Sequence, residues 1–201
     1  MGRHGATLVV LLAVVFLAGC ATSYGNARMA LAQGRYEEAA SGFEDVLARH
    51  PDRLDALVGL GVARYTLGAF DEATTVLTRA VAQAPKSESA QLYLGLSHLQ
   101  KGEDGAAEEH LEAFLELKPN TQIRRQADRA LKLLRGEHLS PEMRAFIAAS
   151  LDDEAEWARA VRAAELAQLG YPPPGFRRFV YGFGYGDGPC FLTRRGYLFC
   201  Y

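Results

Sequence analysis

A 34-residue period constrains this chain more than any other feature of its sequence. Proline recurs at Pro51, Pro85 and Pro119, and glycine and alanine recur with the same spacing. The repeated glycines are Gly34, Gly68, Gly102 and Gly136, and the repeated alanines are Ala39, Ala73 and Ala107. Several residue types that keep one period predict a stack of copies of a single structural unit.

Each copy reads as two helices joined by a short turn. The glycines at Gly34, Gly68 and Gly102 fall where a first helix ends, the usual place for a left-handed residue. The prolines end the second helix, because proline disfavours helical geometry in the residue before it. Gly61 and Gly95 fall inside the first helix, where the missing side chain allows a partner helix to approach closely.

These positions resemble the tetratricopeptide repeat, whose period is 34 and which places Leu-Gly, Ala and Pro as Leu60-Gly61, Ala73 and Pro85 stand here. The resemblance implies a mainly α superhelix of three units, over about residues 20–53, 54–87 and 88–121. A capping helix over 122–135 closes the stack, so that the repeat domain covers 20–136. We expect two additional helices within 137–170, the second from about 153 to 169 and carrying Trp157, Val161 and Ala164 on one stripe.

Residues 1–19 predict a cleaved export signal, because a basic start precedes an apolar run that is shorter than the roughly 20 residues that span a bilayer. Leu17-Ala18-Gly19-Cys20 resembles the bacterial lipobox, which implies a covalent lipid on Cys20 as the new N-terminus. An ordinary signal peptide with a chance cysteine is the alternative. Ala21 in place of Asp favours the outer membrane, facing the periplasm. A host with a single membrane stays open.

Residues 171–201 predict a small antiparallel sheet. Aromatic residues alternate with small ones over 179–185, and Arg194-Arg195-Gly196 is typical of a three-residue hairpin loop. That register places Cys190 opposite Cys200. An exported protein meets oxidising conditions, so we expect a Cys190–Cys200 disulfide. Two free thiols that bind a metal are the alternative.

The charge of the chain is unevenly distributed. A formal net charge of −2 and a pI near 6.2 argue against nucleic-acid binding. Residues 20–170 hold more acidic than basic side chains, whereas residues 171–201 hold four arginines and one aspartate. The tail is therefore suited to docking on the chain's own body, or on anionic lipid or glycan.

No pattern of catalytic residues stands out. The histidines at His50, His98, His110 and His138 form no two-histidine zinc motif, and the glycine-rich stretch over 182–188 lacks the Lys-Ser/Thr of a phosphate-binding loop. We predict a protein that is not an enzyme and that needs neither a metal nor a cofactor besides the lipid.

The resemblance implies that the first helix of each unit lines a concave groove that binds a partner protein. The residues expected to contact the partner are Tyr24, Arg28, Val58, Val62, Tyr65, Leu92, Leu96 and Leu99. The first helix or the tail of the chain itself is the alternative occupant.

The function expected from these features is a membrane-anchored adaptor in bacterial envelope assembly. Tetratricopeptide lipoproteins of this kind act in pilus or secretion-pore assembly, outer-membrane protein insertion or peptidoglycan-enzyme scaffolding. A lipid- or glycan-contacting surface module that works through the basic aromatic tail is the alternative function. The sequence does not indicate an oligomeric state.

Overall fold

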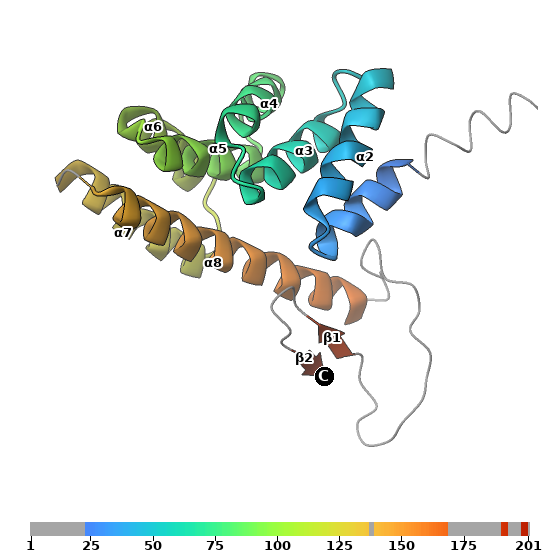
Figure 1. Cartoon of the computed structure of the whole chain (residues 1–201). Coiled ribbons are helices and arrows are strands. Elements are labelled where there is room, and N and C mark those ends of the chain that lie inside the picture. Colours follow the sequence, from blue (N-terminus) through green and yellow to red (C-terminus); the bar gives the residue numbers. More distant parts are fainter. Residues whose placement is uncertain (1–22, 137–138, 169–189, 193–197, 201) are drawn as a thin grey trace, which may run out of the picture.

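The computed structural model describes residues 23–136, 139–168, 190–192 and 198–200. A helical segment over 23–32 precedes seven longer helices that stack side by side (Figure 1). These helices are α2 (Tyr36–Arg49), α3 (Leu54–Thr66), α4 (Phe70–Gln83), α5 (Glu88–Lys101), α6 (Asp104–Glu116), α7 (Thr121–Gly136) and α8 (Pro141–Gln168). Helices that follow one another pack together from α2 to α8, so the chain forms the predicted superhelical stack of helical hairpins.

Three of the repeated glycines make the turn inside each hairpin. Gly34, Gly68 and Gly102 have φ angles of 78°, 78° and 76°, which side chains of other residues rarely tolerate. This confirms the role predicted from their spacing. Gly136 differs, because it is the last residue of α7.

The mid-helix glycines mark the tightest crossings in the core. A Cβ atom on Gly61 would lie 2.4 Å from the Leu77 side chain, and one on Gly95 would lie 3.1 Å from Leu111. Gly59, near the middle of α3, is equally crowded, because a Cβ atom there would lie 2.4 Å from the Phe43 ring. The second helix of each unit therefore packs a large apolar side chain directly on the backbone of a first helix.

The region after the repeats departs from the prediction in one respect. Helix α7 occupies the segment expected for the capping helix. The two additional helices expected over 137–170 are instead one helix, α8, of 28 residues. Neither proline nor glycine interrupts it after Pro141. Its buried residues Ile147, Leu151, Ala155 and Ala158 continue along one face, so packing overrides the weak helix propensity of the Ser and Asp residues near its middle.

Two short strands lie near the C-terminus. β1 (Cys190–Leu192) and β2 (Leu198–Cys200) pair antiparallel, with Cys190 opposite Cys200. The disulfide stays a prediction. The export signal, Cys20 and the aromatic alternation over 179–185 lie outside the described residues. No helix in the described part of the chain is long and apolar enough to cross a membrane.

Candidate protein-binding surface

The inner face of the stack, lined by the first helix of each unit, changes from open to closed along the molecule. Three repeat positions define it, and each recurs every 34 residues. In unit three these positions are Leu92, Leu96 and Leu99, which are 2%, 0% and 0% exposed. In unit two Val62 and Tyr65 are buried and Val58 is partly exposed. In unit one Tyr24 and Leu31 are partly exposed and Arg28 is exposed.

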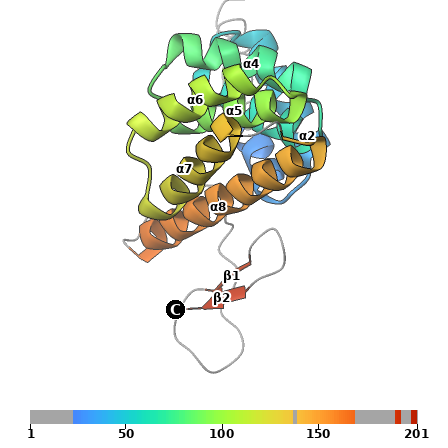
Figure 2. The same ribbon diagram turned by 90° about the vertical axis from the view of Figure 1, so that its left-hand side faces the viewer.

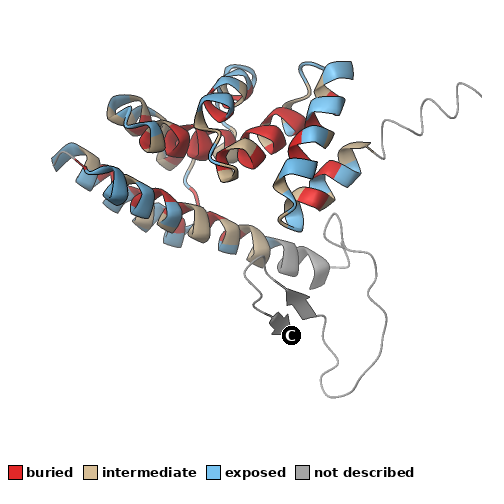
Figure 3. Cartoon of the chain, viewed as in Figure 1, coloured by how far each residue is buried: buried red, intermediate tan, exposed pale blue. Residues whose placement is uncertain are grey.

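Helix α8 closes the inner face at unit three. It turns back after α7 and runs along the stack, in contact with α5 (Figure 2). Its residues Ile147, Ala148, Leu151 and Ala155 belong to the same hydrophobic core as Leu96 of α5. Burial colouring shows the row of buried residues between α8 and the repeats (Figure 3). The part of the expected groove that comprises Leu92, Leu96 and Leu99 is therefore filled by the chain itself, through α8.

A polar cluster around the buried Tyr93, with the partly buried Asp152 and Arg159, fixes α8 to α5. The Tyr93 hydroxyl donates a hydrogen bond to Asp152 Oδ1 at 2.6 Å and accepts one from Arg159 Nη2 at 2.9 Å. The Arg159 guanidinium also lies 5.5 Å from the centre of the Tyr93 ring. Burial raises the pKa of Tyr93 far above its usual value, so the hydroxyl stays protonated and able to donate.

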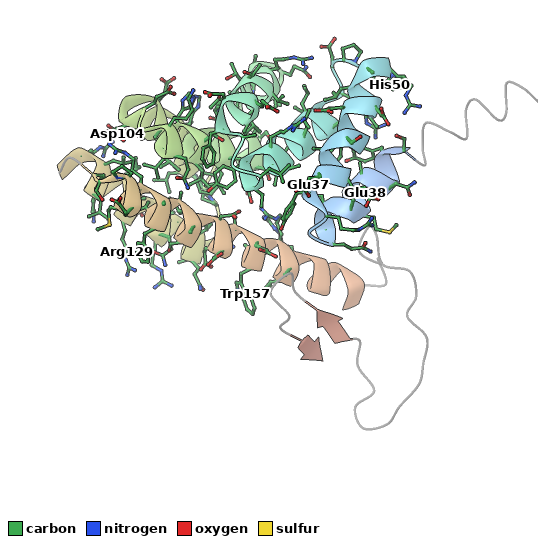
Figure 4. The ribbon with its side chains drawn as sticks, in the orientation of Figure 1. Glu37, Glu38, His50, Asp104, Arg129 and Trp157 are labelled. Carbon is green, nitrogen blue, oxygen red and sulfur yellow. The ribbon has the colours of Figure 1, made fainter. Side chains whose placement is uncertain are left out.

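A second polar contact joins α8 to the start of α6. The Arg144 guanidinium donates to both carboxylate oxygens of Asp104, at 2.9 and 2.6 Å. Figure 4 places Asp104 at this end of the stack. With the Tyr93 cluster, this pair specifies where along the stack α8 lies, because fork-shaped arginine–carboxylate contacts are geometrically selective.

The open end of the inner face carries a cluster of polar and aromatic side chains. The Arg53 guanidinium lies 4.0 Å from the centre of the Tyr24 ring, and that of Arg28 lies 5.8 Å from it. Arg53 also donates to both oxygens of Asp55, at 2.7 and 3.1 Å. Burial, and then the hydrogen bond to Asp55, raises the pKa of Tyr24 to about 12. Next to this cluster, Val58 is only partly buried, so the open surface is amphipathic.

The sequence located the inner face but missed the residues that decide its state. Arg53 and Asp55 precede or begin α3, outside the repeat positions that define the groove. Asp152 and Arg159 are seven residues apart, which places both on one side of a helix, but only if α8 is continuous. The lack of proline and glycine over residues 142–168 was the signal available for them.

The described residues contain no arrangement suited to catalysis that we recognise. No group of three or more metal-binding side chains occurs among them. One small cavity, of about 30 Å³, lies between α5, α7 and α8, where Glu88, Arg159 and Arg162 contribute to its lining. A space of this size holds a water molecule and not an organic substrate.

The fold and the open inner face define a helical-repeat scaffold, and family comparisons identify the repeat. Two models, both described as tetratricopeptide repeat, match residues 30–93 and 70–120. The stack is therefore an array of tetratricopeptide repeats, and such an array serves as a scaffold for protein–protein interaction.

Two larger proteins are similar to this chain over only part of their own length. The protein CTR9 homolog of Arabidopsis thaliana is 29% identical over 100 residues, which are 49% of this chain and 9% of that protein. A mutant O-GlcNAc transferase of Thermobaculum terrenum superimposes with a TM-score of 0.53 and 25% identity, over 69% of this chain and 26% of the transferase. The chain thus spans only a small part of either protein.

Two smaller solved domains are similar over most of their length. The first tetratricopeptide domain of Spaghetti (RPAP3), bound to an HSP90 peptide, has a TM-score of 0.51 and 21% identity, over 58% of this chain and 92% of that domain. The TPR2B domain of yeast Sti1, in a complex with pHsp70, has a TM-score of 0.51 and 17% identity, over 58% of this chain and 95% of that domain. At these identities the likeness describes the fold alone.

Proposed function

We propose that this protein is a lipid-anchored, non-enzymatic adaptor that holds a partner protein during assembly of the bacterial envelope. The observation that carries the proposal is the open inner face of unit one, which the partly exposed Val58 of unit two continues, in a scaffold whose third unit is closed by α8. The lipobox at residues 17–20 supports a lipid on Cys20, and Ala21 in place of Asp supports a location on the outer membrane, facing the periplasm.

The open end of the inner face is also the end nearest the proposed anchor. Only residues 21 and 22 separate Cys20 from the helical segment that begins at residue 23. The three steps along the chain from Cys20 to residue 23, at about 3.5 Å per extended residue, reach roughly 10 Å. The tether therefore supports an arrangement in which the partner is held close to the membrane surface.

The chemistry of the open surface favours an amphipathic partner segment. Val58 and Leu31 offer apolar contact, and Arg28 offers an exposed guanidinium that lies near the Tyr24 ring. A partner helix or extended segment with apolar side chains and an acceptor oxygen fits this surface.

Capture of the partner from detergent-solubilised membranes tests the proposal. Val58→Glu places a charge on the open inner face and should abolish capture. Thr75→Glu, an exposed change on α4, is the matched control and should leave capture intact. A partner held equally well by Val58→Glu contradicts the assigned surface. Leu96→Glu is unsuitable for this test, because Leu96 is fully buried.

The anchor requires a separate experiment. Metabolic labelling with a radioactive fatty acid should mark the wild-type chain, and Cys20→Ser should lose the label and leave the membrane fraction. A labelled Cys20→Ser chain contradicts the proposed lipid site.

We also propose that a Cys190–Cys200 disulfide closes the C-terminal hairpin, as the pairing of these two positions supports. The alternative function, a lipid- or glycan-contacting surface module, makes a different prediction. Removal of residues 171–201 should then abolish lipid or glycan binding, and Val58→Glu should leave that binding unchanged.

A further inference from the structure

The hairpin of α7 and α8 exposes large apolar side chains on its side away from the repeats. Within the described residues, the exposed large hydrophobic side chains are Leu133, Met143, Phe146 and Trp157, at 42%, 45%, 71% and 43%. All of them belong to this hairpin. Figure 4 shows Trp157 projecting from α8 away from the stack. A strip of this kind on a folded protein marks an interaction surface.

A basic ridge borders the apolar strip on α7. Arg125, Arg129 and Lys132 are exposed and lie on successive turns of the helix, opposite its buried residues Ile123 and Ala127. In the described part of the chain none of these three cations has an ion-pair partner. Figure 4 shows Arg129 on the same side of the hairpin as Trp157. Their charge is thus available to an outside group.

An acidic edge borders the strip on its other side. Glu142 is exposed and Asp153 is partly exposed. Each stands four residues before Phe146 or Trp157, which turns it by about 40° around α8, to the side away from α7. The hairpin face thus reads, from α7 across to α8, as basic, apolar and acidic.

The basic residues of α7 and the acidic residues of α8 also lie at similar positions along the helix axes. Gln122 of α7 donates to Glu154 of α8 at 3.2 Å, which sets the antiparallel register of the hairpin. Counting from this contact, Arg125 lies level with residue 151, near Asp153. Lys132 lies level with residue 144, near Glu142.

We propose that this face binds the same face of a second copy, in a two-fold dimer. We place the two-fold axis in the plane of the interface, parallel to α7 and α8. Rotation about this axis brings the basic ridge of one copy over the acidic edge of the other. Arg125 then meets the partner's Asp153, and Lys132 meets the partner's Glu142, while the apolar strips pack at the centre. An axis across the helices would oppose like charges. The charge pattern therefore selects one geometry, as a self-complementary interface requires.

The second copy fits this face better than the other occupants. An anionic bilayer is attracted by the ridge but repelled by the acidic edge, and residues 171–201, which carry four arginines and one aspartate, are attracted by the edge but repelled by the ridge. A second copy presents both charges and complements both borders. The dimer does not depend on the lipid anchor or on the partner proposed above.

Charge reversal provides the test, by sedimentation velocity of the processed, detergent-solubilised full chain. Arg125→Glu and Asp153→Arg should each weaken the dimer by about tenfold or more, because each creates two like-charge contacts per dimer. An equimolar mixture of the two variants should recover wild-type affinity as a heterodimer, since both contacts are then complementary. Lys86→Glu, at an exposed position in the turn before α5, is the control and should leave the dimer unchanged.

Trp157 supplies a second readout, because it is the only tryptophan in the chain. Its emission should shift to longer wavelength when the dimer is diluted, and Trp157→Ala should weaken association while thermal unfolding shows a folded chain.

Four results would overturn the proposal. A chain that is monomeric at about 100 µM, well above the range of specific dimers, is one. A mixture of the charge variants without recovery is another. Greater exposure of Trp157 after removal of residues 171–201 from a monomer identifies the tail as the occupant. A Trp157 shift that needs anionic vesicles identifies the bilayer.

Discussion

Units one and three use the same three repeat positions on the inner face, and the structure treats them in opposite ways. Leu92, Leu96 and Leu99 of unit three are covered by α8, while their counterparts Tyr24, Arg28 and Leu31 stay partly or fully accessible. The side chains differ in the same sense, because leucine suits a core and arginine suits a surface. One scaffold therefore provides a rigid, self-filled end and an accessible end, and only the second suits a partner.

The largest difference in stability between the two ends is expected when a leucine at the closed end is truncated. Leu96→Ala should lower the free energy of unfolding by about 2–5 kcal/mol, because it leaves a cavity between α5 and α8. The equivalent change in unit one, Arg28→Ala, should stay within about 0.5 kcal/mol. Urea denaturation measures both. Equal losses would contradict a difference in closure.

The second-largest difference in stability between the closed and the open end is expected when a tyrosine hydroxyl is removed. Tyr93→Phe leaves Asp152 and Arg159 without their shared partner and should cost about 1–3 kcal/mol. Tyr24→Phe, at the open end, should cost less than about 1 kcal/mol, because water replaces the lost partner of Asp55. Thermal unfolding of the two variants gives the comparison, and a more damaging Tyr24→Phe would reverse it.

The glycine positions sharpen the comparison within the core. Gly61→Ala forces a methyl group against Leu77 and should destabilise by about 1–3 kcal/mol. Gly95→Ala meets Leu111 at 3.1 Å and should be nearly neutral, since alanine favours a helix by about 1 kcal/mol over glycine. Equal losses of stability for the two variants in denaturant unfolding would contradict the claim that the helices cross more tightly at Gly61 than at Gly95.

The smallest effect concerns acid stability at unit three. Burial, and then the neighbouring His98, lowers the pKa of His110, so the native state disfavours its protonation. The stability that this provides is complete above the unfolded pKa, about 6.5, and is lost as the pH falls through the native value. His110→Gln should therefore flatten the loss of stability between about pH 7.5 and 5. His50→Gln, at an exposed position, is the control and should not. An unchanged slope for His110→Gln contradicts the assignment.

The sequence predicted the hairpins well, because their signals are local. Gly34, Gly68 and Gly102 require a left-handed backbone, and the prolines stop helices, regardless of what surrounds them. Gly61 and Gly95 needed only one further assumption, that a helix crosses there. The site was predicted less well, because the groove positions were identified without knowledge of what covers them.

Helix α8 shows why the remainder required the fold. Its local sequence, with Ser150, Asp152 and Asp153 within four residues, resembles a helix boundary as much as a helix interior. Packing of Leu151 and Ala155 against α5 decides the matter, and that contact joins residues far apart in the chain. Asp152 and Arg159 become partners of Tyr93 only once α8 is one helix.

The 34-residue period by itself therefore determined that the chain is a stack of helical hairpins, since each unit's turns and crossings are encoded within it. Only the tertiary structure decided which part of the inner face is open. A repeat specifies its nearest neighbours, whereas the closure of unit three depends on a helix that returns across the stack and buries leucines that the repeat alone would leave exposed.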